Sequence, residues 1–141
     1  MSAEGKKYAV AVVCADGRLH QDSVHFNESI RKHLGVDLVD VLAVAGPDGV
    51  TKPGREGEKD ALVKNLQVLI GAHKPVALAF VAHQACAGNP VSDEEHEVDV
   101  KKMLDTLKSS LDFSGEMVAL VAQHESDTSW PLKEVARIMK Q

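Results

Sequence analysis

The sequence predicts an α/β fold with three layers, in which a mainly parallel sheet lies between helices on both of its faces. Four apolar runs of strand length, rich in Val and Ala, recur along the chain at 8–15, 38–46, 76–82 and 117–123. They mostly do not alternate with polar residues, which is typical of strands that are buried on both faces. Segments with helical spacing lie between them, and this alternation predicts a parallel sheet with the strand order 2-1-3-4.

Four helices are predicted from the spacing of apolar residues, over 22–34, 56–72, 92–111 and from Ser129 onward. The clearest is 56–72, because Leu62, Leu66 and Leu69 recur on one face. The segment 92–111 opens with Ser92 and Glu95 at the spacing of a capping box. The last segment is predicted to be helical because Pro131 is suited to a first helical turn.

The bulk composition indicates one globular domain over residues 1–141. The chain is 44% hydrophobic and 26% charged, which allows a packed core without disulfide bonds. A net charge of −5 argues against binding to nucleic acid or to an anionic membrane surface as the main role. No apolar run is long enough to cross a membrane, and the N-terminal stretch lacks the apolar segment of a signal peptide. We therefore expect a cytoplasmic protein, whose two cysteines indicate metal binding, catalysis or burial rather than a disulfide.

Chemically active side chains follow two of the predicted strands. Cys14, Asp16 and Arg18 come at the end of the first strand, and His83 and Cys86 come at the end of the third. Ligands of open α/β sheets bind at the carboxyl ends of strands, where the strand order reverses. Strands 1 and 3 are neighbours at such a point in the predicted order. We therefore expect Cys14, His83 and Cys86 to converge.

Two cysteines and one histidine are a donor set suited to zinc. Thiolate and imidazole are preferred zinc ligands, and three protein ligands leave a fourth position for water or substrate. Asp16 lies two residues beyond Cys14, so both side chains point the same way in an extended chain. Arg18 lies within reach of Asp16 for a bidentate pair that would keep the carboxylate ionised. The sequence thus predicts one Zn²⁺ per chain.

The two motifs resemble the signatures of the β-class carbonic anhydrases. That family has Cys-x-Asp-x-Arg after the first core strand and His-x-x-Cys after the third, and this chain has CADGR at 14–18 and HQAC at 83–86. The similarity of layout extends over about residues 7–123. The chain departs from the family pattern at Gly17, where Ser is frequent, and at 44–46, where Val-Ala-Gly replaces Asn-Ala-Gly.

The resemblance implies a function and a role for each motif residue. It implies reversible hydration of CO2 to bicarbonate, with zinc held by Cys14, His83 and Cys86. Asp16 and Arg18 are implied to be the catalytic dyad. The family also implies a homodimer or a higher homo-oligomer.

Other interpretations stay open at this point. Asp16 could be a fourth zinc ligand, which would close the site and make it inactive. Alternatively, the closed site could be structural, in a non-catalytic domain that binds a partner. A divergent member of the family could act on CS2 or COS instead of CO2. The glycine-rich loop 45–57 carries Lys52 and Arg55, so a flavodoxin-like phosphate-binding domain is a third interpretation, although the loop matches no phosphate-binding glycine motif.

The remaining histidines are predicted to have minor roles. His20 and His124 are candidates for a proton shuttle, because imidazole titrates near neutrality, but the favoured interpretation is an exposed loop histidine. The same interpretation applies to three further residues, His25, His33 and His73. His96 and Asp99 are three residues apart and are predicted to lie on the solvated face of the 92–111 helix.

Overall fold

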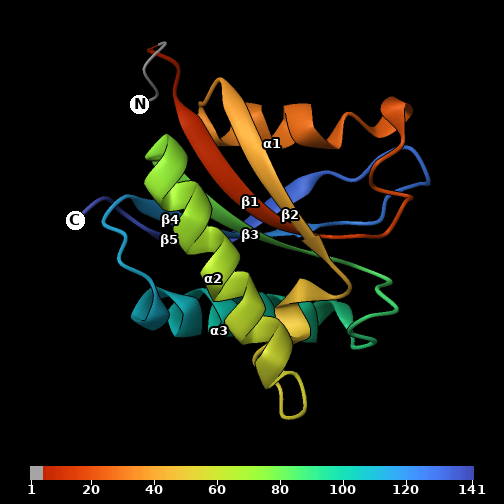
Figure 1. The fold of residues 1–141 in the computed structure, drawn as a ribbon. Helices are drawn as coiled ribbons and strands as arrows, with labels where there is room; N and C mark the ends of the chain where they lie inside the picture. The colour runs from red at the N-terminus through yellow and green to blue at the C-terminus, as the bar shows by residue number, and fades with distance from the viewer. Residues whose placement is uncertain (1–4) are drawn as a thin grey trace.

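The computed structural model describes residues 5–141, which form a five-stranded sheet with helices on both faces (Figure 1). The elements in chain order are β1 (Tyr8–Cys14), α1 (Phe26–Leu34), β2 (Leu38–Val44), α2 (Glu56–His73), β3 (Ala77–His83), α3 (Asp93–Ser110), β4 (Glu116–Ala122) and β5 (Leu132–Ile138). The strand order is β2-β1-β3-β4-β5, with β1 to β4 parallel. The predicted fold class and the order of the first four strands are therefore confirmed. The first four residues of the stretch considered for a signal peptide lie outside the described part.

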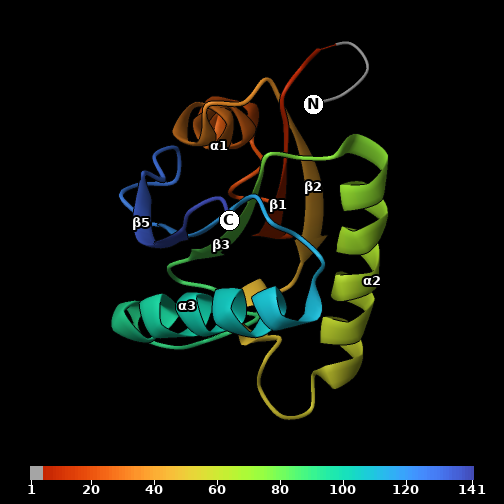
Figure 2. The same cartoon turned by 90° about the vertical axis from the view of Figure 1, so that its left-hand side faces the viewer.

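The sheet is covered by α1 on one face and by α2 and α3 on the other (Figure 2). Alternate side chains of β1 divide between the two cores: Val12 packs with Leu66 of α2 and Leu104 of α3, and Val13 packs with Ile30 of α1. This alternation follows from the period of two residues in a strand. It places β1 and β3 in the middle of the three layers, buried on both faces.

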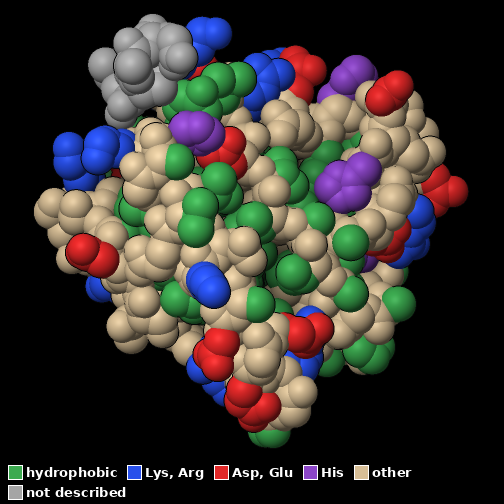
Figure 3. All heavy atoms as spheres, viewed as in Figure 1, with side chains coloured by type: hydrophobic (Ala, Val, Ile, Leu, Met, Phe, Trp, Pro, Cys, Tyr) green, Lys and Arg blue, Asp and Glu red, His purple; other side chains and the backbone are tan. Residues whose placement is uncertain are grey.

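The edge strand β2 differs from the other parallel strands. All of its residues are half-buried or exposed, and the side chain of Val41 is 44% exposed. Hydrophobic side chains are accordingly visible among the surface atoms of the face on which β2 and α2 lie (Figure 3). The prediction that this strand is buried on both faces is therefore wrong, because β2 has a neighbouring strand on one side only.

The first three predicted helices agree with the structure to within a few residues, except at the start of the first. His25 has a left-handed backbone with φ of 53°, and it separates a short 3-10 turn, η1 (Asp22–Val24), from α1. The predicted cap of α3 is present, because the Glu95 N–H donates to Ser92 Oγ at 3.2 Å. Within residues 5–141, none of the helices combines the length and the apolar character needed to span a bilayer.

The segment after Ser129 is a strand and not the predicted helix. β5 pairs antiparallel with β4, with a bulge between Ala119 and Leu120. β4 is a nearly fully buried strand, and without β5 its outer edge would leave backbone N–H and C=O groups unpaired. Pairing with β4 therefore overrides the helical spacing of so short a segment.

A cluster of ion pairs fastens β5 to α1 and β4. Glu134 Oε1 lies 2.8 Å from His33 Nε2 and 2.7 Å from Arg137 Nη2, and Arg137 also contacts Glu116 at 2.6 Å. The hydrogen bonds from Arg137, and then from His33, lower the pKa of Glu134 from its usual 4.5 to about 2. Because this pKa is depressed, the cluster stabilises the fold above about pH 4.5 and loses that contribution as the pH falls toward 2.

We expect Glu134→Gln to lower the free energy of unfolding at neutral pH, by roughly 1 kcal/mol or less because the pairs are partly solvated. The difference from wild type should shrink steadily in urea unfolding curves measured from neutral pH down to strongly acid pH. Asp105→Asn removes the solvent-exposed pair with Lys101 and is the control, with little effect at any pH. A difference between Glu134→Gln and wild type that grows toward acid pH would contradict the assignment.

Candidate metal centre

Cys14 and His83 are the last residues of β1 and β3, and Cys86 lies in the turn that follows β3. β1 and β3 are parallel neighbours, so both strands end at the same edge of the sheet. All three side chains are buried, and their possible ligand atoms lie within 4.8 Å of one another. The structure therefore brings the three predicted ligands together in a cluster that is compatible with a metal ion.

The imidazole of His83 is oriented with one nitrogen toward the cluster. Nδ1 donates to the carbonyl oxygen of Gln84 at 2.7 Å, while Nε2 is buried and lacks a hydrogen-bond partner among residues 5–141. A buried polar atom without a partner is costly, and metal-binding histidines commonly donate their other ring N–H to a carbonyl. The orientation of His83 thus fits a metal ion at Nε2.

The two sulfur atoms lie 3.9 Å apart and share a hydrogen bond. This bond, assisted by the Gly46 N–H at 3.5 Å from Cys14 Sγ, lowers the pKa of Cys14 to about 3 against the effect of burial. The same bond and burial raise the pKa of Cys86. One thiolate and one thiol in contact are a donor set that a divalent cation converts to two thiolates.

Asp16 and Arg18 form the predicted bidentate pair. Arg18 Nη2 donates to Asp16 Oδ2 at 2.6 Å and Arg18 Nε to Oδ1 at 3.2 Å, while the Arg18 backbone N–H donates to Oδ1 at 2.9 Å. Arg18 holds the pKa of Asp16 at about 2, and its own Nη2 is fixed by the Ala85 carbonyl at 2.9 Å. Asp16 Oδ2 lies 3.8 Å from His83 Nε2, so the ionised carboxylate borders the cluster.

Trp130 is part of this neighbourhood and was not found from the sequence. It lies in the connection between β4 and β5 and is 4% exposed. Its ring meets His83 edge-on at 5.6 Å between centroids, the His124 ring at 4.6 Å and the Arg18 guanidinium carbon at 5.4 Å. Its only sequence signal is that it is the single tryptophan of the chain. Trp130 therefore forms an aromatic wall beside the cluster.

His96 and Asp99 are buried, so their predicted place on a solvated helix face is wrong. His96 is 0% exposed and its Nδ1 lies 2.6 Å from Oδ2 of Asp48, which is also 0% exposed. Asp99 accepts from Asn89 Nδ2 at 2.9 Å and pairs with Lys52 at 3.0 Å. The reason is that the loop after β2 covers this side of α3, including the 3-10 turn η2 (Pro47–Gly49).

The phosphate-binding interpretation of this loop finds no support. Lys52 is engaged by Asp99 and Asn89, and Arg55 donates to backbone carbonyls of Ala45 and Gly46. Both predicted cations are thus committed to contacts within the chain.

Two of the other histidines lie near the cluster. His20 Nε2 is 2.8 Å from the carbonyl oxygen of Cys14, and His124 packs on Trp130. The remaining three pair with carboxylates at other places in the fold, namely His25 with Glu28, His33 with Glu134 and His73 with Asp40.

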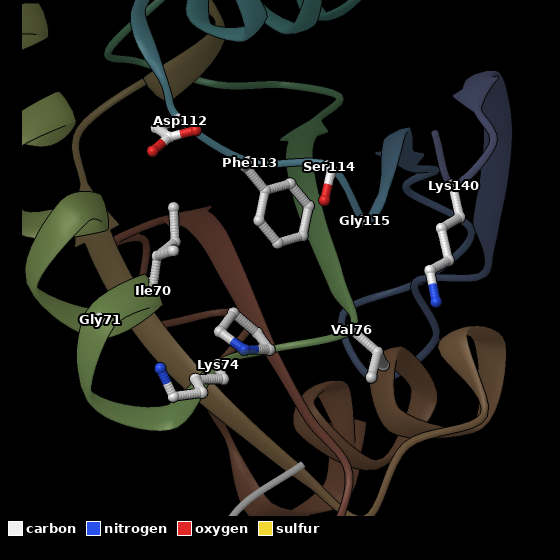
Figure 4. Close-up of a pocket in the computed structure, with 10 residues that line it drawn as sticks. Ile70, Gly71, Lys74, Val76, Asp112, Phe113, Ser114, Gly115 and Lys140 are labelled. Carbon is white, nitrogen blue, oxygen red and sulfur yellow. The ribbon is translucent and has the colours of Figure 1, made fainter.

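A separate hollow of about 460 Å³ lies at the amino ends of β3 and β4, at the opposite edge of the sheet from the cluster (Figure 4). Ile70 and Phe113 line it, with Lys74 and Lys140 at its sides. None of the candidate site residues contributes to this hollow.

The comparisons with known proteins agree with the geometry. Residues 4–135 match a family described as "Putative carbonic anhydrase". Among solved structures, the chain is similar to a carbonic anhydrase from Streptococcus mutans, with a TM-score of 0.59 and 16% identity over 91% of this chain and 81% of that chain. At this identity the similarity shows the fold alone. Among curated proteins, none matches the sequence. Because the family match covers nearly the whole chain, the chain belongs to this carbonic anhydrase family, as its two motifs predicted.

Proposed function

We propose that the protein is a zinc-dependent carbonic anhydrase that catalyses the reversible hydration of CO2 to bicarbonate. The observation that carries the proposal is the buried cluster of Cys14, His83 and Cys86, in which His83 Nε2 lacks a hydrogen-bond partner within the described part of the chain. The fold and the family support the same conclusion. We further propose that Asp16 and Arg18 are the catalytic pair.

Cys14 Sγ, Cys86 Sγ and His83 Nε2 would hold the zinc ion. When bound, zinc supplies a Lewis acid that activates water for attack on CO2. Two thiolates neutralise a divalent cation, so water in this site needs more help from the protein than in a site with three histidines. The proposed role of Asp16 follows from this need.

Asp16 is suited to orient the attacking water. Its carboxylate is ionised, borders His83 Nε2 and can accept a hydrogen bond at Oδ2. Arg18 fixes that carboxylate through both oxygens and is itself held by the Ala85 carbonyl. The Arg18 guanidinium carbon also lies 5.4 Å from the centre of the Trp130 ring, a cation–π contact that helps to orient it.

The same contacts favour an open site over one closed by Asp16. Both oxygens of Asp16 accept hydrogen bonds from Arg18, and within residues 5–141 the metal-compatible cluster comprises Cys14, His83 and Cys86 without Asp16. Moving Asp16 onto the metal would require these hydrogen bonds to break. Three protein ligands and one open position are the arrangement of catalytic zinc sites.

Zinc content and stopped-flow CO2 hydration, measured on one purified sample, test the proposal. We expect one zinc per chain and hydration that is abolished by a strong chelator and restored by zinc. Stoichiometric zinc with no hydration from neutral to mildly alkaline pH would refute CO2 as the substrate and direct the assay to CS2 and COS. A sample that contains and binds no zinc would refute the metal site itself.

Trp130 provides an optical test of the site that does not depend on activity. It is the only tryptophan of the chain, and its ring contacts His83. We expect Co²⁺ added to metal-free protein to quench the tryptophan fluorescence, with saturation at one equivalent, because the ion would bind next to the indole. His73→Gln is the control. His73 ends α2 and stacks on Tyr8, at the opposite end of β1 from Cys14, so this variant should titrate like wild type. Binding of Co²⁺ at full stoichiometry without any quenching would contradict this placement.

A further inference from the structure

Two turns beside the metal centre are in direct backbone contact. Gly46 follows β2, and Gly88 lies two residues beyond Cys86. A Cβ atom on Gly46 would lie 2.3 Å from the Gly88 carbonyl carbon, and one on Gly88 would lie 2.5 Å from the Gly46 nitrogen. Gly46 also has φ of 54°, which favours glycine. The two turns can approach this closely only because both residues lack a side chain.

Each turn is linked to one of the two cysteines. The Gly46 N–H is directed at Cys14 Sγ at 3.5 Å. Gly88 lies in the same turn as Cys86 and is in backbone contact with Gly46. Hydrogen bonds from N–H groups stabilise a thiolate charge. The position of the Gly46 turn therefore decides how well Cys14 Sγ carries negative charge, and the backbone contact with Gly88 fixes that position.

Arg55 joins the two turns. Its Nη2 donates to the Ala45 carbonyl at 2.6 Å, and its Nη1 donates to the Gly46 carbonyl at 2.8 Å and to that of Gly88 at 3.4 Å. One planar guanidinium thus satisfies carbonyl groups from both sides of the contact. Arg55 also forms an ion pair with Glu58 of α2 through its Nε, and this ion pair involves neither turn.

A second set of contacts anchors the same two segments to α3. Lys52 Nζ donates to Asn89 Oδ1 at 2.7 Å and pairs with Asp99 at 3.0 Å. The fully buried pair of Asp48 and His96 fastens η2 to the first turns of α3. These contacts connect the loop after β2 to α3 at two points.

We propose that Arg55 is a positioning residue for the metal centre, which holds the turns at Gly46 and Gly88 together so that the Gly46 N–H supports the Cys14 thiolate and the turn that carries Cys86 keeps its place beside it. Lys52 and the Asp48–His96 pair assist by anchoring the turns to α3. The inference rests on the proposed zinc site. It means that metal affinity depends on a side chain that does not touch the metal, which is a property of residues that support metal ligands.

The test compares Arg55→Met, which keeps much of the side-chain volume but removes all the donors, with Glu58→Gln as a matched control. Zinc affinity is measured by competition with a chromophoric chelator, and folding by circular dichroism. We expect Arg55→Met to weaken zinc binding by about 10- to 100-fold and Glu58→Gln to leave it near the wild-type value. Arg55→Lys retains the positive charge but lacks the guanidinium group that spans the two turns, so its zinc affinity should be close to that of Arg55→Met. An affinity of Arg55→Lys equal to wild type would show that charge alone acts and would overturn the bridging role.

The Co²⁺-substituted protein separates a positioning role from a purely structural one. Loss of N–H donors raises the energy of the sulfur lone pairs, so the thiolate-to-cobalt charge-transfer band of Arg55→Met should move to lower energy. A folded Arg55→Met with unchanged affinity and an unchanged band overturns the inference and leaves the proposed zinc site intact. Should Arg55→Met fail to fold, Asp48→Asn and Lys52→Met undergo the same comparison and are expected to show the same shift. A wild-type protein that binds neither Zn²⁺ nor Co²⁺ overturns the proposed function together with this inference.

Discussion

Replacing Cys86 by serine is expected to abolish stoichiometric zinc binding and leave the fold intact. Serine occupies nearly the same volume, but its hydroxyl does not ionise at neutral pH and is a poor zinc ligand. The substitution also removes the hydrogen bond that connects Cys86 to Cys14 at 3.9 Å. Two of the three ligands remain, and they cannot form a closed or catalytic zinc site on their own.

Zinc per chain, measured by atomic spectroscopy after dialysis, should fall from one to nearly zero in Cys86→Ser, with an unchanged circular dichroism spectrum. Ala85→Ser is the matched control, because it places the same hydroxyl in the same turn while keeping every ligand and the Ala85 carbonyl that holds Arg18. We expect this control to retain its zinc. Full zinc content in Cys86→Ser would show that the metal is bound elsewhere.

Asp16→Asn is expected to retain zinc and lose most of the CO2 hydration rate. The amide has the shape of the carboxylate but not its negative charge, so it no longer attracts a proton from the attacking water. The substitution also puts an NH2 group, a donor, in place of one of the two carboxylate oxygens that accept hydrogen bonds from the Arg18 guanidinium. Loss of a positioned acid–base group of this kind costs about 10²- to 10⁴-fold in rate. Because the pKa of Asp16 is about 2, the wild-type carboxylate is ionised throughout the neutral range, and its own titration should not limit activity there.

Stopped-flow hydration and zinc content, measured on the same Asp16→Asn sample, separate the two proposed roles of this carboxylate. Asp127→Asn is the matched control, since it removes a mostly exposed carboxylate on the His124 side of the same surface. We expect near wild-type turnover from this control. Zinc lost together with activity would identify Asp16 as a metal ligand, and activity retained in Asp16→Asn would exclude it from the chemistry.

The four parallel strands and their order were predictable because their signal is local. β1, β3 and β4 are continuous apolar runs that can lie only where both faces are covered, and their alternation with helical segments requires crossover connections. β5 was not predictable in the same way. Its seven residues suit either a helix or an edge strand, and the choice depends on the open edge of β4, which lies in another part of the chain. The homo-oligomer and the cytoplasmic location stay predictions.

The candidate metal centre was likewise predictable only where its residues are close in sequence. Cys14, Asp16 and Arg18, and likewise His83 and Cys86, are close in sequence, so strand geometry and turn spacing already point each motif at one edge of the sheet. The sequence by itself thus determined the fold class, the converging donor set and the family. Only the tertiary structure decided what surrounds that set. Trp130 reaches His83 through a strand connection, Asp48 meets His96 across 48 residues, and Arg55 joins two glycine turns from separate loops. The physical reason is that such contacts arise from packing between segments distant in the chain, which no local periodicity records.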